Sequence, residues 1–373
     1  MSLALLAGGA FLMDSPRAWA ADVASSRELL LVCDTDNLAA LSGEVYNVAA
    51  MTPPGLVKIL DVASARSFKI DTPFFGHTLT QNPDRPHQIA TFEKWGRKGA
   101  LVDLKEKALV AHFETSGDNI FFGHAAYIPG ASVLVTSEDN ERRTDGQLVV
   151  RDSSNMKTIR KFSSYGVKPH ESRLVDHGRT LMVLNQGWGD YLTNLAWVDM
   201  NSGKLLHKIM LNVTPASTFA HMDISHDGWI AVVGYILPGQ QAASSLFGLI
   251  APDGRVIRLQ APVDMAADLR NEVVGVTFLG KSGLVAVAAS HADHVLVWKY
   301  KTQEFVASVQ TPSPKGIIPD LAALDSKPAV IVSSYKARDL TELIFSPQDK
   351  APAIAKTDPS FGGCGSHLVR VYA

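Results

Sequence analysis

The chain has 373 residues, of which 46 % are apolar and 19 % charged, and 35 basic side chains against 37 acidic ones leave a formal net charge of −2. This near balance argues against binding to nucleic acid, because no bulk positive charge attracts a phosphate backbone. The apolar fraction is sufficient for a folded core. No apolar run reaches the ~18 residues that a membrane-spanning helix requires.

Residues 1–20 have the pattern of an export signal. Residues 3–13 are apolar, and Ala18-Trp19-Ala20 has the small-x-small pattern that precedes a cleavage site. The usual basic segment is missing, since Arg17 is the first basic residue, and a buried N-terminal helix is the alternative. We expect an exported, periplasmic protein with a single folded domain over residues 21–373.

The rest of the chain repeats one hairpin seven times. Each copy has two short strands of alternating apolar and polar residues, rich in β-branched side chains, on either side of a polar turn. The turns are about 48 residues apart and are centred on Asp61, Asp103, Asp152, Asp199, Asp253, Tyr300 and Ser346. A repeat of this length with about four short strands is typical of a β-propeller.

Two further strands in each repeat complete a four-stranded blade. The innermost strand of each blade is predicted to begin near His77, His124, His170, His221, Gly275, Ile318 and His367. The strand after His367 has no blade following it, and the first strand, residues 28–33, has no inner strand before it. We therefore predict an all-β fold, a seven-bladed propeller that the C-terminal inner strand closes by pairing with three N-terminal strands. Such closure leaves no open ring ends.

Ring closure has a consequence for the two cysteines. It brings the start of the C-terminal strand, near Cys364, beside the end of the N-terminal strand, at Cys33. Two cysteines with Cα atoms ~5.5–6 Å apart can form a disulfide in an oxidising compartment. We predict a Cys33–Cys364 disulfide, with two buried free thiols as the alternative.

Five of the seven inner strands begin at a histidine, so the repeat predicts that these side chains face the central channel at one end of the ring. They are His77, His124, His170, His221 and His367. Loops that open on the same face add polar and aromatic candidates, which are Trp95, Arg97, Glu138, Asn140, Arg142, Glu171, Asn185 and Trp188. A polar, aromatic-rimmed concavity is the usual place for a small ligand. We predict a ligand site at this channel mouth.

A metal ion is the one cofactor that these residues indicate, because neutral imidazole is the commonest metal ligand. Opposite blades are expected to hold their rings apart, so that only adjacent histidines share an ion. The adjacent trio is His77, His124 and His170. The alternative is that each histidine is a buried hydrogen-bonding bracket between a loop and a neighbouring strand.

Two other functions fit the same face. No motif of a triad hydrolase, a zincin or a nucleotide-binding loop occurs. An enzyme would therefore be a metal-assisted hydrolase or lyase, with Glu138 or Glu171 as general base. A scaffold for another periplasmic protein would use Trp95, Trp188 and Arg143 as anchors.

Several segments resemble the DUF1513 family of exported bacterial propeller proteins of unknown function. They are Gly76-His77, Gly123-His124 with Thr136-Ser137-Glu138-Asp139-Asn140, and Pro169-His170-Glu171 followed by an Asn185 loop. Trp95 interrupts the arginine-rich loop of the family, and Gln186-Gly187 replaces its Gly-Gly pair. The resemblance covers nearly all of residues 21–373. It implies a periplasmic propeller and a link to iron acquisition, since relatives are encoded beside iron-acquisition proteins.

Overall fold

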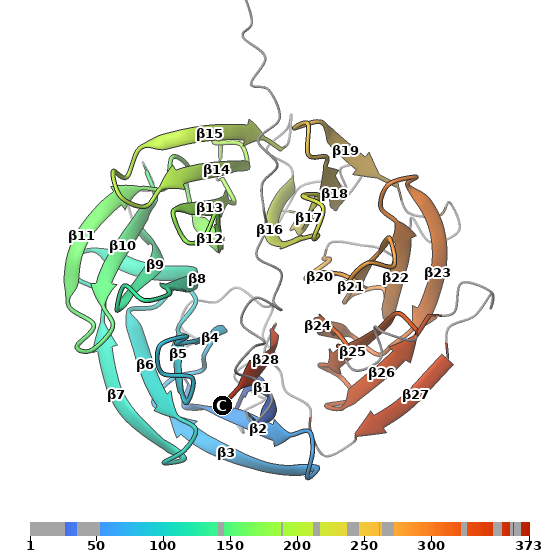
Figure 1. The fold of residues 1–373 in the computed structure, drawn as a ribbon, viewed down its shortest axis with the longest axis horizontal. Helices are drawn as coiled ribbons and strands as arrows, with labels where there is room; N and C mark the ends of the chain where they lie inside the picture. The colour runs from blue at the N-terminus through green and yellow to red at the C-terminus, as the bar shows by residue number, and fades with distance from the viewer. Residues whose placement is uncertain are drawn as a thin grey trace, which may run out of the picture.

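The computed structural model describes residues 27–35, 53–140, 145–187, 189–211, 217–236, 246–260, 262, 272–321, 327–345, 353–358, 361 and 367–373. Over these residues the chain forms strands β1 to β28, paired in seven four-stranded sheets. The sheets are arranged as blades around a central axis (Figure 1). The predicted seven-bladed propeller is confirmed. No helix in the described part of the chain is long and apolar enough to cross a membrane.

The blades are numbered 1 to 7, and each is given from its innermost strand outward. Blade 1 contains β28 (Leu368–Tyr372), β1 (Glu28–Asp34), β2 (Gly55–Asp61) and β3 (Arg66–Thr72). Blade 2 contains β4 (Thr78–Gln81), β5 (Gln88–Phe92), β6 (Lys98–Asp103) and β7 (Ala108–Glu114). Blade 3 contains β8 (Asn119–Ile128), β9 (Val133–Asn140), β10 (Gln147–Asp152) and β11 (Thr158–Ser163). Blade 4 contains β12 (Pro169–Val175), β13 (Thr180–Asn185), β14 (Asn194–Asp199) and β15 (Leu205–Met210).

The remaining blades follow in chain order. Blade 5 contains β16 (Ser217–Ile224), β17 (Ile230–Ile236), β18 (Phe247–Ile250) and β19 (Val256–Leu259). Blade 6 contains β20 (Gly275–Phe278), β21 (Leu284–Ala289), β22 (His294–Lys299) and β23 (Glu304–Gln310). Blade 7 contains β24 (Pro314–Pro319), β25 (Ala329–Ser334), β26 (Leu340–Ile344) and β27 (Ala353–Asp358). The inner strand of blade 7 thus begins at Pro314, earlier than the predicted Ile318.

Burial is highest in the middle strands of the blades and lowest in the outermost strands. All side chains of β13 and β21 are buried, and β21 is apolar throughout while β13 is apolar between Thr180 and Asn185. Strands covered on both faces have this composition, because each face packs against another layer. The outer strand β15, by contrast, is mostly exposed. Apolar clusters between neighbouring blades, such as Val233 and Leu249 of blade 5 with Val287 and Trp298 of blade 6, hold the ring together.

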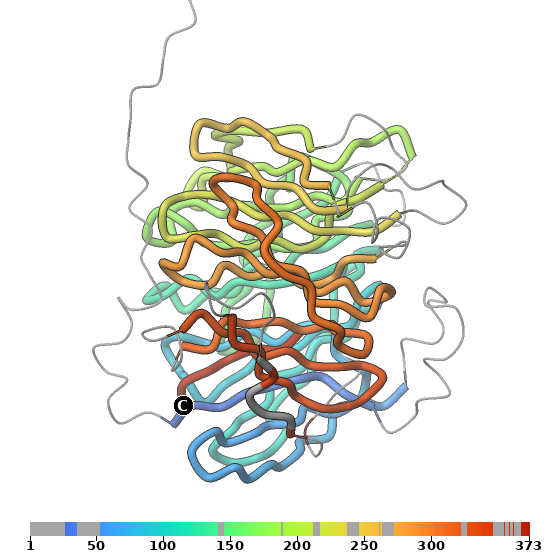
Figure 2. The backbone as a smooth tube through the Cα atoms, turned by 90° about the vertical axis from the view of Figure 1, so that its right-hand side faces the viewer, coloured from blue at the N-terminus to red at the C-terminus, as the bar shows by residue number. Residues whose placement is uncertain are grey.

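The ring closes in blade 1, where the two ends of the described chain pair. Strand β28 is antiparallel to β1, with Tyr372 opposite Glu28 and Leu368 opposite Val32. The blue N-terminal strand and the red C-terminal strand meet in this blade (Figure 2). The predicted closure by strand order is therefore confirmed.

Aspartates explain the recurring turn between the two outer strands. The Oδ1 atom of Asp103 accepts hydrogen bonds from the backbone amides of Lys105 and Glu106, both at 2.9 Å. Asp199 Oδ1 accepts one from the amide of Ser202 at 2.6 Å. An aspartate that bonds its own backbone two or three residues on stabilises a tight turn.

Cys33 is a buried, free thiol in the structure. Its Sγ atom lies 3.8 Å from Thr91 Oγ1, and burial raises the pKa of the thiol to about 12. The other half of the predicted disulfide, Cys364, lies outside the described residues. The Cys33–Cys364 disulfide therefore stays a prediction.

Candidate functional site

Irregular pairing at the start of three inner strands redirects the side chains near the axis. The register shifts between Phe121 and Ala125 in β8, between Pro169 and Glu171 in β12, and between Phe219 and His221 in β16. A bulge inserts an unpaired residue and changes the direction of the neighbouring side chains. The histidines of blades 3, 4 and 5 lie at these bulges.

Glycine before two of the histidines allows the blades to approach closely. A Cβ atom at Gly123 would lie 2.1 Å from the carbonyl oxygen of His170 in the next blade. A Cβ atom at Gly76 would lie 2.2 Å from Thr91 Oγ1 and 2.9 Å from Cys33 Sγ. No larger residue fits at these distances, so the Gly-His pairs are required by the contact between blades.

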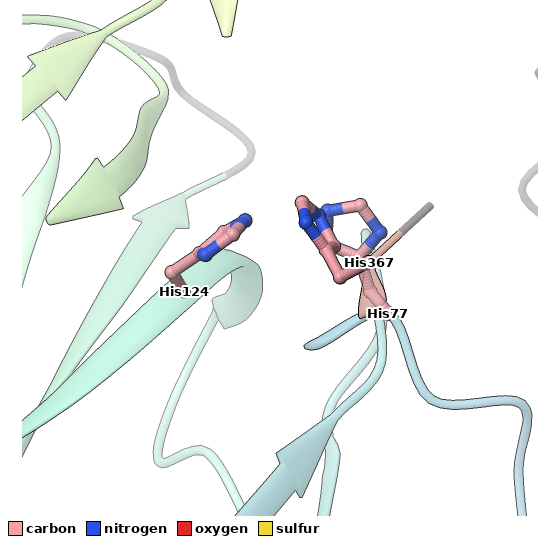
Figure 3. A group of neighbouring side chains, drawn as sticks. All are labelled: His77, His124 and His367. Atoms are coloured by element: carbon pink, nitrogen blue, oxygen red, sulfur yellow. The ribbon is translucent and has the colours of Figure 1, made fainter. Parts of the chain in front are cut away.

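The five predicted histidines come together at the axis, from blades 1 to 5. The ring centroids of His124 and His367 are 4.4 Å apart, those of His221 and His367 are 4.7 Å apart, and those of His77 and His221 are 6.3 Å apart. The ring of His124 faces those of His367 and His77 (Figure 3). The expectation that distant blades hold their rings apart was wrong, because the imidazoles of blades 1 and 5 reach across the narrow axis.

Their nitrogens form two sets of three in which every ligand atom lies within 4.8 Å of the others. One set is His77, His124 and His367, and the other is His124, His170 and His221. The predicted trio His77, His124 and His170 is divided between these sets, and His124 belongs to both. Tetrahedral coordination by Zn–N bonds of ~2.0–2.1 Å separates the nitrogens by about 3.3 Å. The imidazoles of either set would have to turn toward one another to reach that spacing.

Hydrogen bonds define the tautomer of His170. Its Nδ1–H donates to the carbonyl oxygen of Phe122 at 2.9 Å, so Nε2 carries the lone pair. That lone pair lies 3.3 Å from His77 Nε2, which donates to it. The Nδ1 atom of His124 lies 3.5 Å from Thr78 Oγ1, and its buried Nε2 has no hydrogen-bond partner among the described residues.

Glu171 connects the cluster to a charged network. Its Oε2 lies 3.3 Å from His221 Nδ1, a close contact that is not aligned as a hydrogen bond, and accepts the amide of Met222 at 2.9 Å. Its Oε1 lies 2.6 Å from Arg173 Nη2. Burial alone would raise the pKa of Glu171, but the charge of Arg173 and the neighbouring histidines hold it well below its usual range. Glu171 is therefore an ionised carboxylate beside His221.

All five imidazoles are in their neutral form near pH 7. Burial is the main cause that lowers their pKa values, to about 3 for His124, and the positive charge of Lys94 lowers each of the five further. Burial also lowers the pKa of Lys94, to about 8. Neutral imidazole is the form that coordinates metal ions.

Glu138, predicted as a ligand or a general base, is instead a buried structural residue of blade 3. Its Oε1 lies 2.5 Å from Arg151 Nη2 and accepts the hydroxyl of Thr136 at 2.8 Å, while Oε2 accepts Asn119 Nδ2 at 2.9 Å. Both carboxylate oxygens are occupied and the side chain is fully buried. Only Glu171 of the two proposed bases lies beside the histidines.

The other predicted residues divide between the rim and the blades. The ring of Trp95 lies 6.1 Å from that of Phe122, which itself packs against His170. Asn185 is fully buried and donates to Asn194 Oδ1 within blade 4 and to Ser164 O just after β11 of blade 3. Arg97 is exposed, Asn140 is half-buried at the end of β9, and Arg142, Arg143 and Trp188 lie outside the described residues.

Sequence reasoning missed Lys94 and the partners of the histidines. Lys94 stands next to the predicted Trp95, but only one blade carries it, so no repeat indicates it. Thr78 and Phe122 are uncharged residues next to or near a histidine in the sequence. Their proximity to His124 and His170 depends on the packing of neighbouring blades.

Solved structures similar to this chain share its fold at low sequence identity. Hydrazine synthase of Kuenenia stuttgartiensis is 15 % identical with a TM-score of 0.61, covering 79 % of this chain and 90 % of the other. A protein from Lactobacillus plantarum is 10 % identical with a TM-score of 0.60, covering 93 % and 99 %. The Cps50 (Swd1) β-propeller domain of Myceliophteria thermophila is 13 % identical with a TM-score of 0.52, covering 75 % and 86 %. At such identities the likeness shows the fold alone.

A search of curated proteins finds no match to the chain. A family model does match, over residues 70–349, and its description is a protein of unknown function, DUF1513. This match includes four of the five axial histidines and most of the seven blades. The chain belongs to the DUF1513 family.

Proposed function

We propose that the protein is a periplasmic metal-binding propeller that holds a divalent transition-metal ion among its axial histidines. The observation that carries the proposal is the set His124, His170 and His221 on three consecutive blades, with nitrogens within 4.8 Å of one another. Neutral imidazoles at this spacing are the donors that such ions prefer.

The outer nitrogens support the same conclusion. Nδ1 of His170 donates to a backbone carbonyl, Nδ1 of His221 faces the carboxylate of Glu171, and Nδ1 of His124 faces the hydroxyl of Thr78. In metal sites, a ligating histidine nearly always donates its second N–H to a carbonyl, a carboxylate or water, which fixes the ring. This arrangement directs Nε2 of each ring toward the ion, which would replace the hydrogen bond that His77 donates to His170 Nε2.

The donor set also indicates which ion is bound. Three imidazoles without a directly available carboxylate suit zinc, copper, nickel and iron(II), whereas calcium and magnesium prefer oxygen ligands. Copper(II) and zinc should bind more tightly than iron(II), following the usual order of affinities. Iron(II) remains within the class, which keeps the link to iron acquisition as part of the proposal. Export rests on the sequence of residues 1–20, which lie outside the described residues.

Metal titration of the purified protein tests this function. After dialysis against a chelator, zinc and copper(II) are expected to bind at about one equivalent with a Kd of ~1 μM or tighter, measured by calorimetry and elemental analysis. Calcium and magnesium at the same concentrations should not bind. Failure of every transition metal to bind below ~1 mM, or equal binding of calcium and zinc, would contradict the proposal.

The role of Glu171 gives a second test. Glu171→Gln keeps the shape and an acceptor for the Met222 amide but removes the charge that orients His221. Zinc affinity is expected to fall about 10- to 100-fold, as for other residues that orient metal ligands. The matched control is Glu304→Gln, which removes an exposed carboxylate that pairs with Lys299. Equal zinc affinity in the Glu171→Gln variant and the wild type, in folded protein, would assign Glu171 a structural role only.

A further inference from the structure

A lysine stands near the five histidines, and it has no counter-ion in the part of the chain that the structure describes. Lys94 is half-buried, and its Nζ lies 5.4 Å from the centroid of Trp95. Within the described ranges no carboxylate lies within ion-pair distance of Lys94. The charge of Glu272 raises the pKa of Lys94, but only from a longer distance. An ammonium that is partly withdrawn from water favours the binding of a small anion beside it.

Strand pairing puts Lys94 at the same end of the ring as the histidines. The last residue of β5, Phe92, pairs with Thr78, the residue after His77, and Lys94 follows two residues later. This placement agrees with the effect of the Lys94 charge, which lowers the pKa of all five imidazoles.

Two further groups near this end can donate to an anion. Gln186 follows β13, whose last residue pairs with Pro169 beside His170. Its Oε1 accepts the hydroxyl of Tyr235 at 3.0 Å, but its buried Nε2 has no partner among the described residues. Lys315, on β24, holds its Nζ 5.0 Å from the centroid of Tyr335 and repels Lys94.

The positive charge at the axial site requires compensation once a divalent metal ion is bound there. Neutral imidazoles leave the full double charge on the ion, and Lys94 adds a third positive charge nearby. Glu171 supplies one negative charge, but Arg173 already pairs with it. A small anion that coordinates the ion and contacts the ammonium would offset this excess.

We propose that the axial site binds its metal ion together with a small oxyanion of the carboxylate or carbonate type, which contacts the ion and Lys94 at the same time. The inference rests on the proposed metal function and adds the second ligand. Three imidazoles leave a fourth tetrahedral position for the oxyanion. The exposed Lys204, on the turn after β14, serves as the control because it is far from any of these contacts.

Zinc affinity is measured at constant ionic strength in chloride and then with bicarbonate, acetate or sulfate. A chromophoric chelator reports free zinc, so that zinc bound by the anion in solution is accounted for. In the wild type and in Lys204→Met, bicarbonate or acetate is expected to tighten zinc binding about tenfold. Lys94→Met should lose this gain, and in chloride it should bind zinc at least as tightly as the wild type. A stronger response to sulfate would identify a tetrahedral oxyanion and overturn the carboxylate or carbonate assignment.

Other outcomes separate the two proposals. Zinc binding that is identical with and without oxyanions, or an equal oxyanion effect in Lys94→Met, overturns the oxyanion site and leaves the metal site standing. Weaker zinc binding by Lys94→Met in chloride alone also overturns the oxyanion site, because Lys94 would then be needed to hold the zinc site in its folded shape. Absence of zinc binding in every protein and buffer overturns the metal function itself.

Discussion

Replacing His170 with alanine is expected to weaken zinc binding about 100-fold or more, whereas replacing His367 should change it by less than about threefold. His170 belongs to the set of three whose outer nitrogens are oriented by Thr78, Phe122 and Glu171. His367 belongs only to the other set. His124→Ala should be as damaging as His170→Ala, because His124 is common to both sets.

Calorimetry with zinc on each variant checks this order, with unfolding temperatures recorded to confirm folded protein. His112→Ala, in the exposed outer strand β7, is the control for loss of a surface imidazole. The reverse order, with His367→Ala losing zinc and His170→Ala keeping it, would move the ion to the set His77, His124 and His367. Equal, small losses of zinc affinity in all variants would show that the ion does not bind at the axis.

The second large effect is expected on stability and not on binding. Arg151→Met should lower the free energy of unfolding by about 3–5 kcal/mol, because it leaves the fully buried carboxylate of Glu138 without its cation. Glu138→Gln should cost a similar amount for the opposite reason. The double variant should recover much of the loss, since buried ion pairs contribute little net stability against apolar or neutral replacements.

Chemical denaturation of the two single variants and the double variant measures this coupling. The exposed pair Lys299–Glu304 is the control, and disrupting it should change the free energy of unfolding by less than about 1 kcal/mol. Additive losses in the double variant would mean that Glu138 and Arg151 act independently. That outcome would return Glu138 to consideration as a functional carboxylate.

The fold could be predicted well because its determinants are local and repeated. Alternating apolar residues give the strands, and aspartates such as Asp103 and Asp199 give the turns between them. Closure followed from two unpartnered strands at the ends of the repeat. The start of β24 was placed too late, because Pro314 and Gly316 do not have strand propensity and the pairing is irregular there.

The candidate site could be predicted only in part. Repeat positions give the order of the histidines around the ring, but not the width of the channel, which depends on contacts such as Gly123 against His170. Glu138 was assigned to the site from its place at a strand end. Its partner Arg151 lies on the next strand of the same blade, a pairing that sequence spacing does not reveal.

The placement of His124, His170 and His221 on β8, β12 and β16 has a mechanical consequence. One ion held by all three would cross-link blades 3, 4 and 5 at their inner ends. Pulling any of these blades away from its neighbour would then require the ion to dissociate first. Metal-loaded protein should therefore resist heat and proteases more than the metal-free form, by an amount set by metal affinity and concentration.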